Sequence, residues 1–288
     1  MGKIRIGVSG WSYDEWRGSF YPEDLPSDDQ LAYATRVFDT IEINGTFYSL
    51  TDPETCRRWR EVAPRHFRYS VKGSRYITHI RRLKDPEQPL ANFFASGILE
   101  LGRLMGPVLW QLPANYAFDA GTVERFLETL PRDTSAAVEL ARNHDERVDN
   151  ASFGDRENHR LRHVLEFRHP SFKSEETARM ARRHGVALCS SHSSDWPYVE
   201  EVTAGLVYLR LHGPGQLYAS KYPRSDLDRW ADRIRTWQRG DQPDDAERIS
   251  DLQPPKRRER DVFVYFDNTA DGHAPEDARY LMEQIDGG

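Results

Sequence analysis

The chain has 288 residues, of which 38% are hydrophobic and 30% charged, so its composition is that of a folded protein. This length allows two small domains or one large α/β domain. The formal net charge of -6 disfavours a general nucleic-acid-binding surface, although it leaves room for a local basic cleft. The two cysteines, Cys56 and Cys189, are too few for a disulfide scaffold or a cysteine-based zinc site.

The first residues run directly into an expected strand and lack the apolar core of a signal peptide. No segment approaches the roughly 18 consecutive apolar residues that a membrane-spanning helix needs. We therefore expect a soluble, cytoplasmic protein without membrane association. The sequence predicts neither a cofactor nor an oligomeric state.

Eight short apolar or alternating segments are typical of strands, near residues 4–9, 38–44, 67–72, 107–112, 163–168, 186–190, 206–212 and 262–267. Helix-like stretches lie between most of them, at 28–36, 53–63, 89–104, 121–130, 173–184, 225–239 and 275–285. The stretch after the sixth strand is the weakest, with at most one turn around 196–203. Strands that alternate with helices over this length predict an α/β fold, a single (β/α)8 TIM barrel spanning residues 1–288.

Two stretches depart from this alternation. Residues 133–162 are long and charged, and we interpret them as an insertion, either a helical excursion or a mobile loop. Residues 240–261 are polar and contain prolines, which favours a flexible loop. Both precede a strand, so we expect them on the N-terminal face of the barrel, away from the usual position of an active site.

Polar and apolar side chains alternate along several strands. In the fifth strand, Leu165 and Phe167 face one side while Glu166 and Arg168 face the other. If the apolar side packs against the helices, the polar side points into the barrel near its C-terminal mouth. The same argument brings further polar residues to this mouth: Ser9, Glu42, Asn44, Lys72, Gln111, Arg210, His212, Asp267 and Asn268.

A single pair of these groups, such as Glu166 with Arg210, is most simply a structural ion pair. A whole set at one end of the barrel is harder to explain in this way, because each buried charge costs several kcal/mol before it is paired. Perturbed charges also cluster at functional sites. We therefore expect a ligand-binding or catalytic pocket at the mouth.

The cationic side chains Lys72, Arg168 and Arg210 suit an anionic ligand, since arginine can contact such a group through two hydrogen bonds. The loop after the seventh strand contains Gly213 and Gly215, and in barrels this loop frequently binds phosphate. A phosphorylated ligand fits this position, although a Gly-Pro-Gly sequence is by default a tight turn.

Proton transfer requires a base whose pKa is set by burial and by neighbouring charges, and Glu42 or Glu166 could serve. His169 and His212 are further candidates, although a histidine beside an apolar strand is equally often structural. A metal site built from Glu42, Glu166, His212 and Asp267 is the alternative. We assign no metal ligand, because no compact ligand spacing is present and the neighbouring lysine and arginines would repel a cation.

Seven motifs resemble the DUF72 or YecE-like family: GVSGWSYDEWRGSFYP (7–22), FDTIEINGTFYSL (38–50), KGSRYITH (72–79), QLP (111–113), LEFRHPSF (165–172), VYLRLHG (207–213) and VYFDNTADGHAPEDA (264–278). They occur in the family's order over nearly the whole chain. The resemblance implies a TIM-barrel fold but no particular reaction.

The resemblance also implies site residues, some of which the alternation along the strands does not predict. The positions that coincide with the family motifs are Ser9, Gly10, Trp11, Tyr13, Trp16, Glu42, Asn44, Phe47, Tyr48, Lys72, Thr78, His79, Gln111, Glu166, Arg168, His169, Arg210, His212 and Gly213. The family's last strand usually ends in FNND, whereas this chain has Phe266, Asp267, Asn268 and Thr269. The family also reaches the fifth strand sooner, which agrees with an insertion at 133–162.

Our leading hypothesis is an enzyme that acts on a small anionic, phosphorylated or nucleotide-like compound by acid–base chemistry, with Glu42, Glu166 and His212 as catalytic residues. The other residues predicted at the mouth would bind this substrate. One alternative is a ligand sensor or a nucleic-acid-associated module that binds without turnover. Another is a metal-dependent hydrolase or nuclease.

Overall fold

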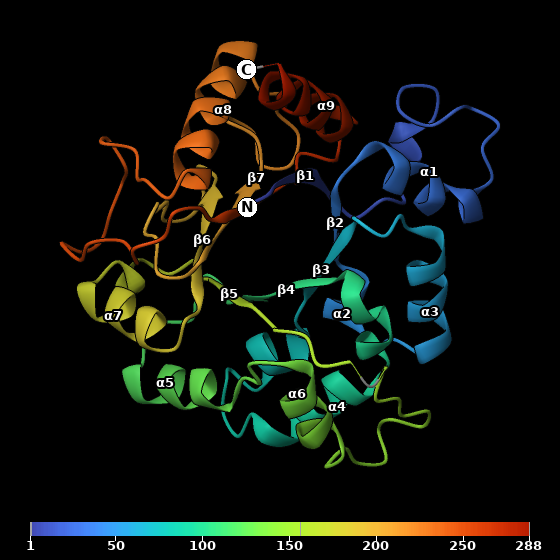
Figure 1. Cartoon of the computed structure of the whole chain (residues 1–288), viewed down its shortest axis with the longest axis vertical. Coiled ribbons are helices and arrows are strands. Elements are labelled where there is room, and N and C mark those ends of the chain that lie inside the picture. Colours follow the sequence, from blue (N-terminus) through green and yellow to red (C-terminus); the bar gives the residue numbers. More distant parts are fainter. Residues whose placement is uncertain (1, 156, 288) are drawn as a thin grey trace.

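A computed structural model describes residues 2–155 and 157–287. Eight parallel strands form a closed barrel in sequence order, and β8 pairs with β1 to complete it (Figure 1). The strands are β1 (Ile4–Ser9), β2 (Thr40–Ile43), β3 (Arg68–Lys72), β4 (Met105–Gln111), β5 (His163–Glu166), β6 (Ala187–His192), β7 (Leu206–Leu211) and β8 (Asp261–Phe266). The predicted TIM barrel is therefore confirmed.

Helices surround the strands (Figure 1). They are α1 (Gln30–Val37), α2 (Gly45–Tyr48), α3 (Pro53–Val62), α4 (Glu87–Ala95), α5 (Ala120–Thr129), α6 (Thr134–Ala141), α7 (Glu175–Arg183), α8 (Arg224–Gln238) and α9 (His273–Asp286). Within the described ranges, none is long and apolar enough to cross a membrane.

Side-chain caps explain where several helices begin. Asp52, Asp119, Asp133 and Ser174 each accept a hydrogen bond from the backbone N–H three residues later, which satisfies a donor that the first turn leaves free. The long helix predicted over 89–104 is wrong, because α4 ends at Ala95. Gly97 then takes a left-handed conformation (φ 113°), and a separate 3-10 segment runs from Ile98 to Leu104.

The inside of the barrel consists of three layers of side chains. A middle layer is apolar and aromatic and includes Leu109, Val164, Tyr208, Phe263 and Tyr265. Charged side chains lie on both sides of it. Those near the beginning of the strands include Arg5 and Asp261, and those near the end form the mouth predicted from the alternation.

The connection from β6 to β7 contains no helix in the described chain, and residues 240–261 cover its place. In Figure 1 this irregular orange-red segment lies between α7 and α8. It is anchored by two buried carboxylates: Glu201 accepts from the backbone N–H groups of Ile249 (2.9 Å) and Ser250 (3.2 Å), and Glu200 accepts from that of Glu247 (3.0 Å). The segment is irregular as expected, yet it is held in place and not a free loop.

Residues 133–162 begin with the short helix α6, which packs against α4, and then continue without regular structure. This part is also fixed to the barrel. The backbone N–H of Ser152 donates to the carbonyl of Ala95 (2.9 Å), and Asn92 donates to Asp145 (2.9 Å). Of the two forms that we considered for 133–162, a helical excursion or a mobile loop, the structure has one short helix followed by an irregular segment, and Arg156 lies outside the described residues.

Candidate functional site

Arg210 of β7 lies at the centre of the polar layer at the C-terminal mouth, with only 1% of its surface exposed. Its guanidinium group donates to Glu42 (Nη2–Oε1 2.8 Å and Nε–Oε2 3.2 Å), Glu166 (Nη1–Oε2 2.9 Å) and Asp267 (Nη2–Oδ2 2.8 Å). Nη1 also lies 3.1 Å from Nε2 of His212. The three carboxylates take four of the five N–H groups of the arginine, and the fifth is buried beside His212, so none is exposed to a ligand.

Glu42 of β2 is also saturated. Besides Arg210, it accepts hydrogen bonds from the hydroxyls of Ser9 (2.7 Å) and Tyr208 (2.6 Å). Asn44 donates in turn to the Ser9 hydroxyl (2.9 Å). Because Glu42 is fully buried and surrounded by donors, the arrangement suits a fixed carboxylate that positions Arg210.

Glu166 of β5 joins the two arginines of the site. Its second oxygen accepts from Nε of Arg168 (2.7 Å), whose guanidinium group stacks 3.7 Å from the ring centroid of Trp196. Burial by itself would raise the pKa of Glu166, but the charges of Arg168 and Arg210 lower it to about 2. Glu166 is therefore ionised at neutral pH and is a weak base.

His212 follows β7 and is completely buried. Its Nε2 lies 3.2 Å from Oδ2 of Asp267, whereas its buried Nδ1 has no hydrogen-bond partner in the described structure. The rings of Trp196 (5.0 Å) and Tyr218 (5.5 Å) cover it. Burial lowers the pKa of His212 and Arg210 lowers it further, although the hydrogen bond with Asp267 opposes both, so the neutral imidazole is favoured.

Lys72 ends β3 and also points into the mouth. No described residue forms an ion pair or hydrogen bond with its Nζ, which lies over the ring of Phe47, 4.7 Å from the centroid. Burial and the nearby charge of Arg210 lower the pKa of Lys72. His79 packs against the same Phe47 ring, and burial followed by the charge of Lys72 lowers its pKa to about 4.

Other residues expected at the mouth lie at its wall or rim. Gln111 ends β4 and is buried beside Glu166, which ends the neighbouring strand β5. Tyr48 is 70% exposed and contacts Phe47 edge-on. Trp11 packs against Trp59 of α3 (5.6 Å).

Three expected site residues do not join the charged cluster. His169 binds the hydroxyl of Ser171 (2.7 Å) and caps the short 3-10 turn Pro170–Phe172. Asn268 donates to Asp277 of α9 (2.8 Å). Gly213 has a left-handed φ of 102°, and its N–H donates to the Tyr222 hydroxyl (3.1 Å), so this loop does not present a phosphate cradle.

Three aromatic residues outside our list of site residues contact the charged cluster, and two of them, Trp196 and Tyr218, are among the aromatic residues that the sequence places near the mouth. Tyr208 binds Glu42 from the middle layer, and Trp196 and Tyr218 cover His212. Tyr208 could have been found, since it shares the inward face of its strand with Arg210 and His212. Trp196 and Tyr218 lie in loops, where no periodicity indicates direction. Tyr218 has a left-handed φ of 63°, a strained conformation of the kind that clusters at functional sites.

The geometry of the mouth does not favour the metal site that the sequence analysis gave as an alternative. Arg210 already occupies the centre of Glu42, Glu166 and Asp267 with a positive charge, which would oppose a second cation. Groups with metal-ligand spacing in the described chain lie elsewhere: Glu124, Glu128 and His184, and Asp155, Glu157 and His159. Acidic clusters of this kind are common without a metal.

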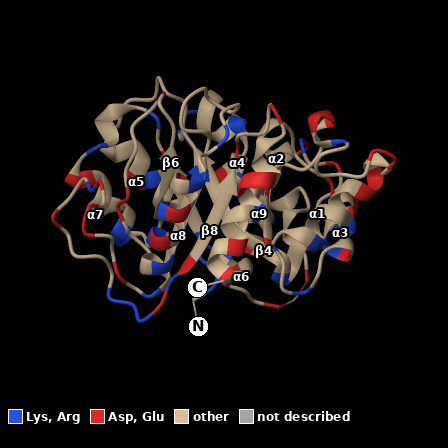
Figure 2. Cartoon of the chain, turned by 90° about the horizontal axis from the view of Figure 1, so that it is seen from above, with Lys and Arg blue, Asp and Glu red and all other residues tan. Residues whose placement is uncertain are grey.

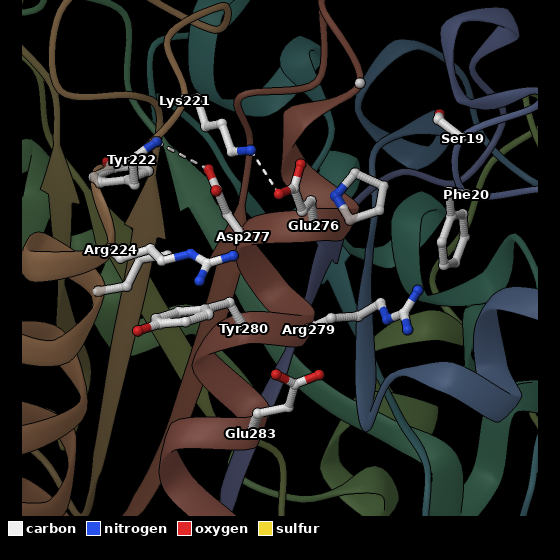
Figure 3. A pocket seen from close by; sticks show the side chains of 13 residues that line it. Ser19, Phe20, Lys221, Tyr222, Arg224, Glu276, Asp277, Arg279, Tyr280 and Glu283 are labelled. Atoms are coloured by element: carbon white, nitrogen blue, oxygen red, sulfur yellow. Dashed lines mark hydrogen bonds and ion pairs between the residues drawn. The ribbon is translucent and has the colours of Figure 1, made fainter.

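A separate cavity of about 370 Å³ lies outside the barrel beside α9 (Figure 3). Lys221 extends into it and pairs with Glu276 (2.6 Å), as the dashed line in Figure 3 shows. Lys221 thus faces α9 and not the mouth. This position gives a further reason not to treat the loop after β7 as a phosphate site.

Comparison with known proteins shows to which family the chain belongs. The sequence profile described as "Protein of unknown function DUF72" matches residues 5–287. The chain belongs to the DUF72 family. The UPF0759 protein YecE of Escherichia coli, strain K12, is 30% identical over 138 residues, which are 48% of this chain and 48% of YecE. The match thus spans about half the length of this curated relative.

Solved DUF72 structures share the barrel. A DUF72 protein from Thermotoga maritima MSB8 superposes with a TM-score of 0.74 at 22% identity, over 98% of this chain and 99% of its own. Another from Enterococcus faecalis V583 gives a TM-score of 0.69 at 15% identity, over 99% and 96%. At these identities the likeness shows the fold alone.

Proposed function

We propose that the mouth is the active site of an enzyme that binds a small compound through an anionic group and transfers a proton on it. The observation that carries this proposal is the unpaired Nδ1 of His212. A buried ring nitrogen without a partner is costly, and the other nitrogen of the same ring, Nε2, lies beside the carboxylate of Asp267. A substrate atom that bonds to Nδ1 would remove this cost.

Arg168 is the residue that would hold the anionic group. Glu166 uses its Nε and the Tyr218 side chain also hydrogen-bonds to it, but its terminal nitrogens form no ion pair in the described chain. The stack on Trp196 fixes the plane of the guanidinium group, so that two parallel hydrogen bonds to a carboxylate or phosphate need little reorganisation. Arg210, which we first expected in this role, is not carried into the proposal because its donors are occupied.

His212 and Lys72 are the candidate proton carriers. If Nε2–H of His212 donates to Asp267, Nδ1 is left as an acceptor that can take a proton from the substrate. Burial lowers the pKa of Lys72, and no described residue forms an ion pair with it, so its proton is more easily given up than that of an exposed lysine. Glu42 and Glu166, first expected as bases, would instead keep Arg210 and Arg168 in position.

Two variants separate binding from turnover. Purified protein is screened for thermal stabilisation by small carboxylates, phosphate esters and nucleotides, and each hit is incubated and analysed by mass spectrometry. We expect Arg168→Gln to lose the stabilisation by the hit compound. We expect His212→Gln to keep it while product formation falls by roughly 100-fold or more, the usual contribution of general acid–base catalysis.

Arg75→Gln, an exposed arginine near β3, is the matched control and should change neither result. A hit compound that binds through Arg168 but is recovered unchanged after long incubation would contradict the proposal. That outcome would favour the non-enzymatic ligand sensor.

A further inference from the structure

The opposite, N-terminal end of the barrel contains the most basic surface of the described cavities. A cavity of about 800 Å³ lies where the strands begin, and its wall contains seven arginines and three histidines against two carboxylates, Glu259 and Asp261. Blue segments of the ribbon lie along this lower edge in Figure 2. Since the whole chain has a net charge of -6, this concentration of positive charge is not an average property of the surface.

Arg68 and Arg162 line the floor of this cavity, and Arg5 lies beside them outside the lining; these guanidinium groups share few acceptors. Arg162 pairs with Asp261 (2.6 Å), and the same carboxylate lies at the edge of ion-pair distance (4.0 Å) from Nη1 of Arg5. The side chain of Arg5 is only 8% exposed, and its Nη1 has no hydrogen-bond partner in the described structure. Among the described residues, the guanidinium group of Arg68 donates to backbone carbonyls alone, most closely to that of Phe67 (2.6 Å).

This floor is electrostatically unfavourable without an anion. Burial lowers the pKa of Arg68, and the charges of Arg5 and Arg162 lower it further. Like charges this close repel one another, and a buried unpaired donor is costly. An anion at the floor would relieve both effects.

The rim supplies arginines that are free to close around such an anion. Arg65, Arg160 and Arg257 are exposed, and within the described ranges their side chains form no ion pair or hydrogen bond. They come from the segments before β3, β5 and β8, so they approach the cavity from three sides.

We propose that this cavity is a second binding site, for a compact ligand that bears several phosphate groups. Arginine pairs with phosphate through two parallel hydrogen bonds, and several arginines on different walls fit a ligand with more than one phosphate. The volume lies within the range of about 300–1,000 Å³ that small-molecule pockets have. Extended nucleic acid fits less well, because it needs a continuous basic track and not a concavity with acidic groups at its edge.

Titration calorimetry with inorganic tripolyphosphate, at about 0.15 M salt to suppress weak surface attraction, tests the site. The triple variant Arg65→Ala, Arg160→Ala, Arg257→Ala should bind roughly 30-fold more weakly than the unsubstituted protein, about threefold for each exposed charge pair. The matched control, Arg58→Ala, Arg125→Ala, Arg229→Ala, removes three exposed arginines that do not line the cavity and should bind as the unsubstituted protein does.

Further measurements test where the tripolyphosphate probe binds and which class of ligand the site prefers. Binding that is lost in Arg168→Gln but kept in the rim variant would place the probe at the C-terminal mouth and overturn this inference. Equal loss in the control variant would also overturn it, because the effect would then follow net charge alone. ATP should compete with tripolyphosphate, and a single-stranded oligonucleotide that binds more tightly than either would favour nucleic acid and overturn the compact ligand.

Discussion

At the scale of single residues, Arg210 shows how a residue type can suggest the wrong role. An arginine at the mouth of a barrel is suited to bind an anion, but here three buried carboxylates surround it: Glu42, Glu166 and Asp267. A charge that recognises a ligand must be at least partly free, and for that reason our proposal gives this role to Arg168. Arg210 therefore acts as the counter-charge that allows three carboxylates to share one site.

Replacement of Arg210 by methionine should destabilise the fold as well as the site. Three buried carboxylates would lose their counter-charge, and breaking a buried pair typically costs about 3–5 kcal/mol. The free energy of unfolding, measured in urea at pH 7, should fall by roughly that amount. Arg75→Met, an exposed change, should have little effect. Equal stability of Arg210→Met and the unsubstituted protein would contradict the central role of Arg210.

The difference in stability between the unsubstituted protein and Arg210→Met should depend on pH. The pKa of Glu166 is lowered from 4.5 to about 2, so its ion pairs contribute stability above about pH 4.5, and this contribution is lost as the pH falls toward 2. The stability difference between the unsubstituted protein and Arg210→Met should therefore be largest near neutral pH and shrink below pH 4.5. A difference that stays constant from pH 7 to pH 3 would show that the carboxylates are not its cause.

At the scale of elements, an irregular segment covers a part of the barrel that a helix covers elsewhere. The connection between β6 and β7 leaves part of the barrel wall without a helical cover, and residues 240–261 occupy this place. Two buried glutamates replace the internal hydrogen bonds of a helix by accepting from backbone N–H groups of the segment. Such carboxylate acceptors can fix a chain that has too little apolar surface to pack by itself.

Glu201→Ala should release the segment. The variant loses three hydrogen bonds to residues 249 and 250, at roughly 1 kcal/mol each, so the free energy of unfolding should fall by about 2–3 kcal/mol. Limited proteolysis should then cut within 240–261 faster than in the unsubstituted protein. Glu61→Ala, at an exposed position of α3, is the control. Unchanged cleavage in Glu201→Ala would mean that other contacts hold the segment.

At the scale of the whole molecule, the barrel separates two charged layers by an apolar one. The mouth cluster around Arg210 and the arginines near the strand beginnings lie on opposite sides of the middle layer. Phe263 forms part of the boundary, because Arg5 (5.2 Å) and Arg162 (5.1 Å) both lie over its ring. Because this layer separates the two ends, we expect the two sites to bind independently.

Phe263→Ala should therefore lower the free energy of unfolding by more than the removal of a phenylalanine ring from the surface does. Truncation of a buried phenylalanine typically costs about 3–5 kcal/mol through the cavity it leaves. Phe118→Ala, at a partly exposed position, should cost clearly less. Denaturant unfolding of both variants measures the difference. A loss for Phe263→Ala no greater than for Phe118→Ala would indicate that the middle layer does not hold the barrel together.

The sequence by itself determined the barrel and the face of each strand. Alternation with a period of two is a local property, so Glu166 and Arg168 could be assigned to the inside and Leu165 and Phe167 to the outside without knowledge of their neighbours. The motifs shared with the DUF72 family determined the strand order over nearly the whole chain. The break at Gly97 was missed because the apolar pattern of the predicted helix continues beyond it.

Only the tertiary structure decided which of the inward groups are paired. The ion pairs of Arg210 join β2, β5 and β7 with the residue after β8, and no local pattern contains such distances. The structure likewise decided that loop residues Trp196 and Tyr218 cover His212 and that arginines from separate segments meet at the N-terminal end. Residues far apart in the chain form these contacts, and their energies depend on burial and on charge neighbours that the closed barrel creates.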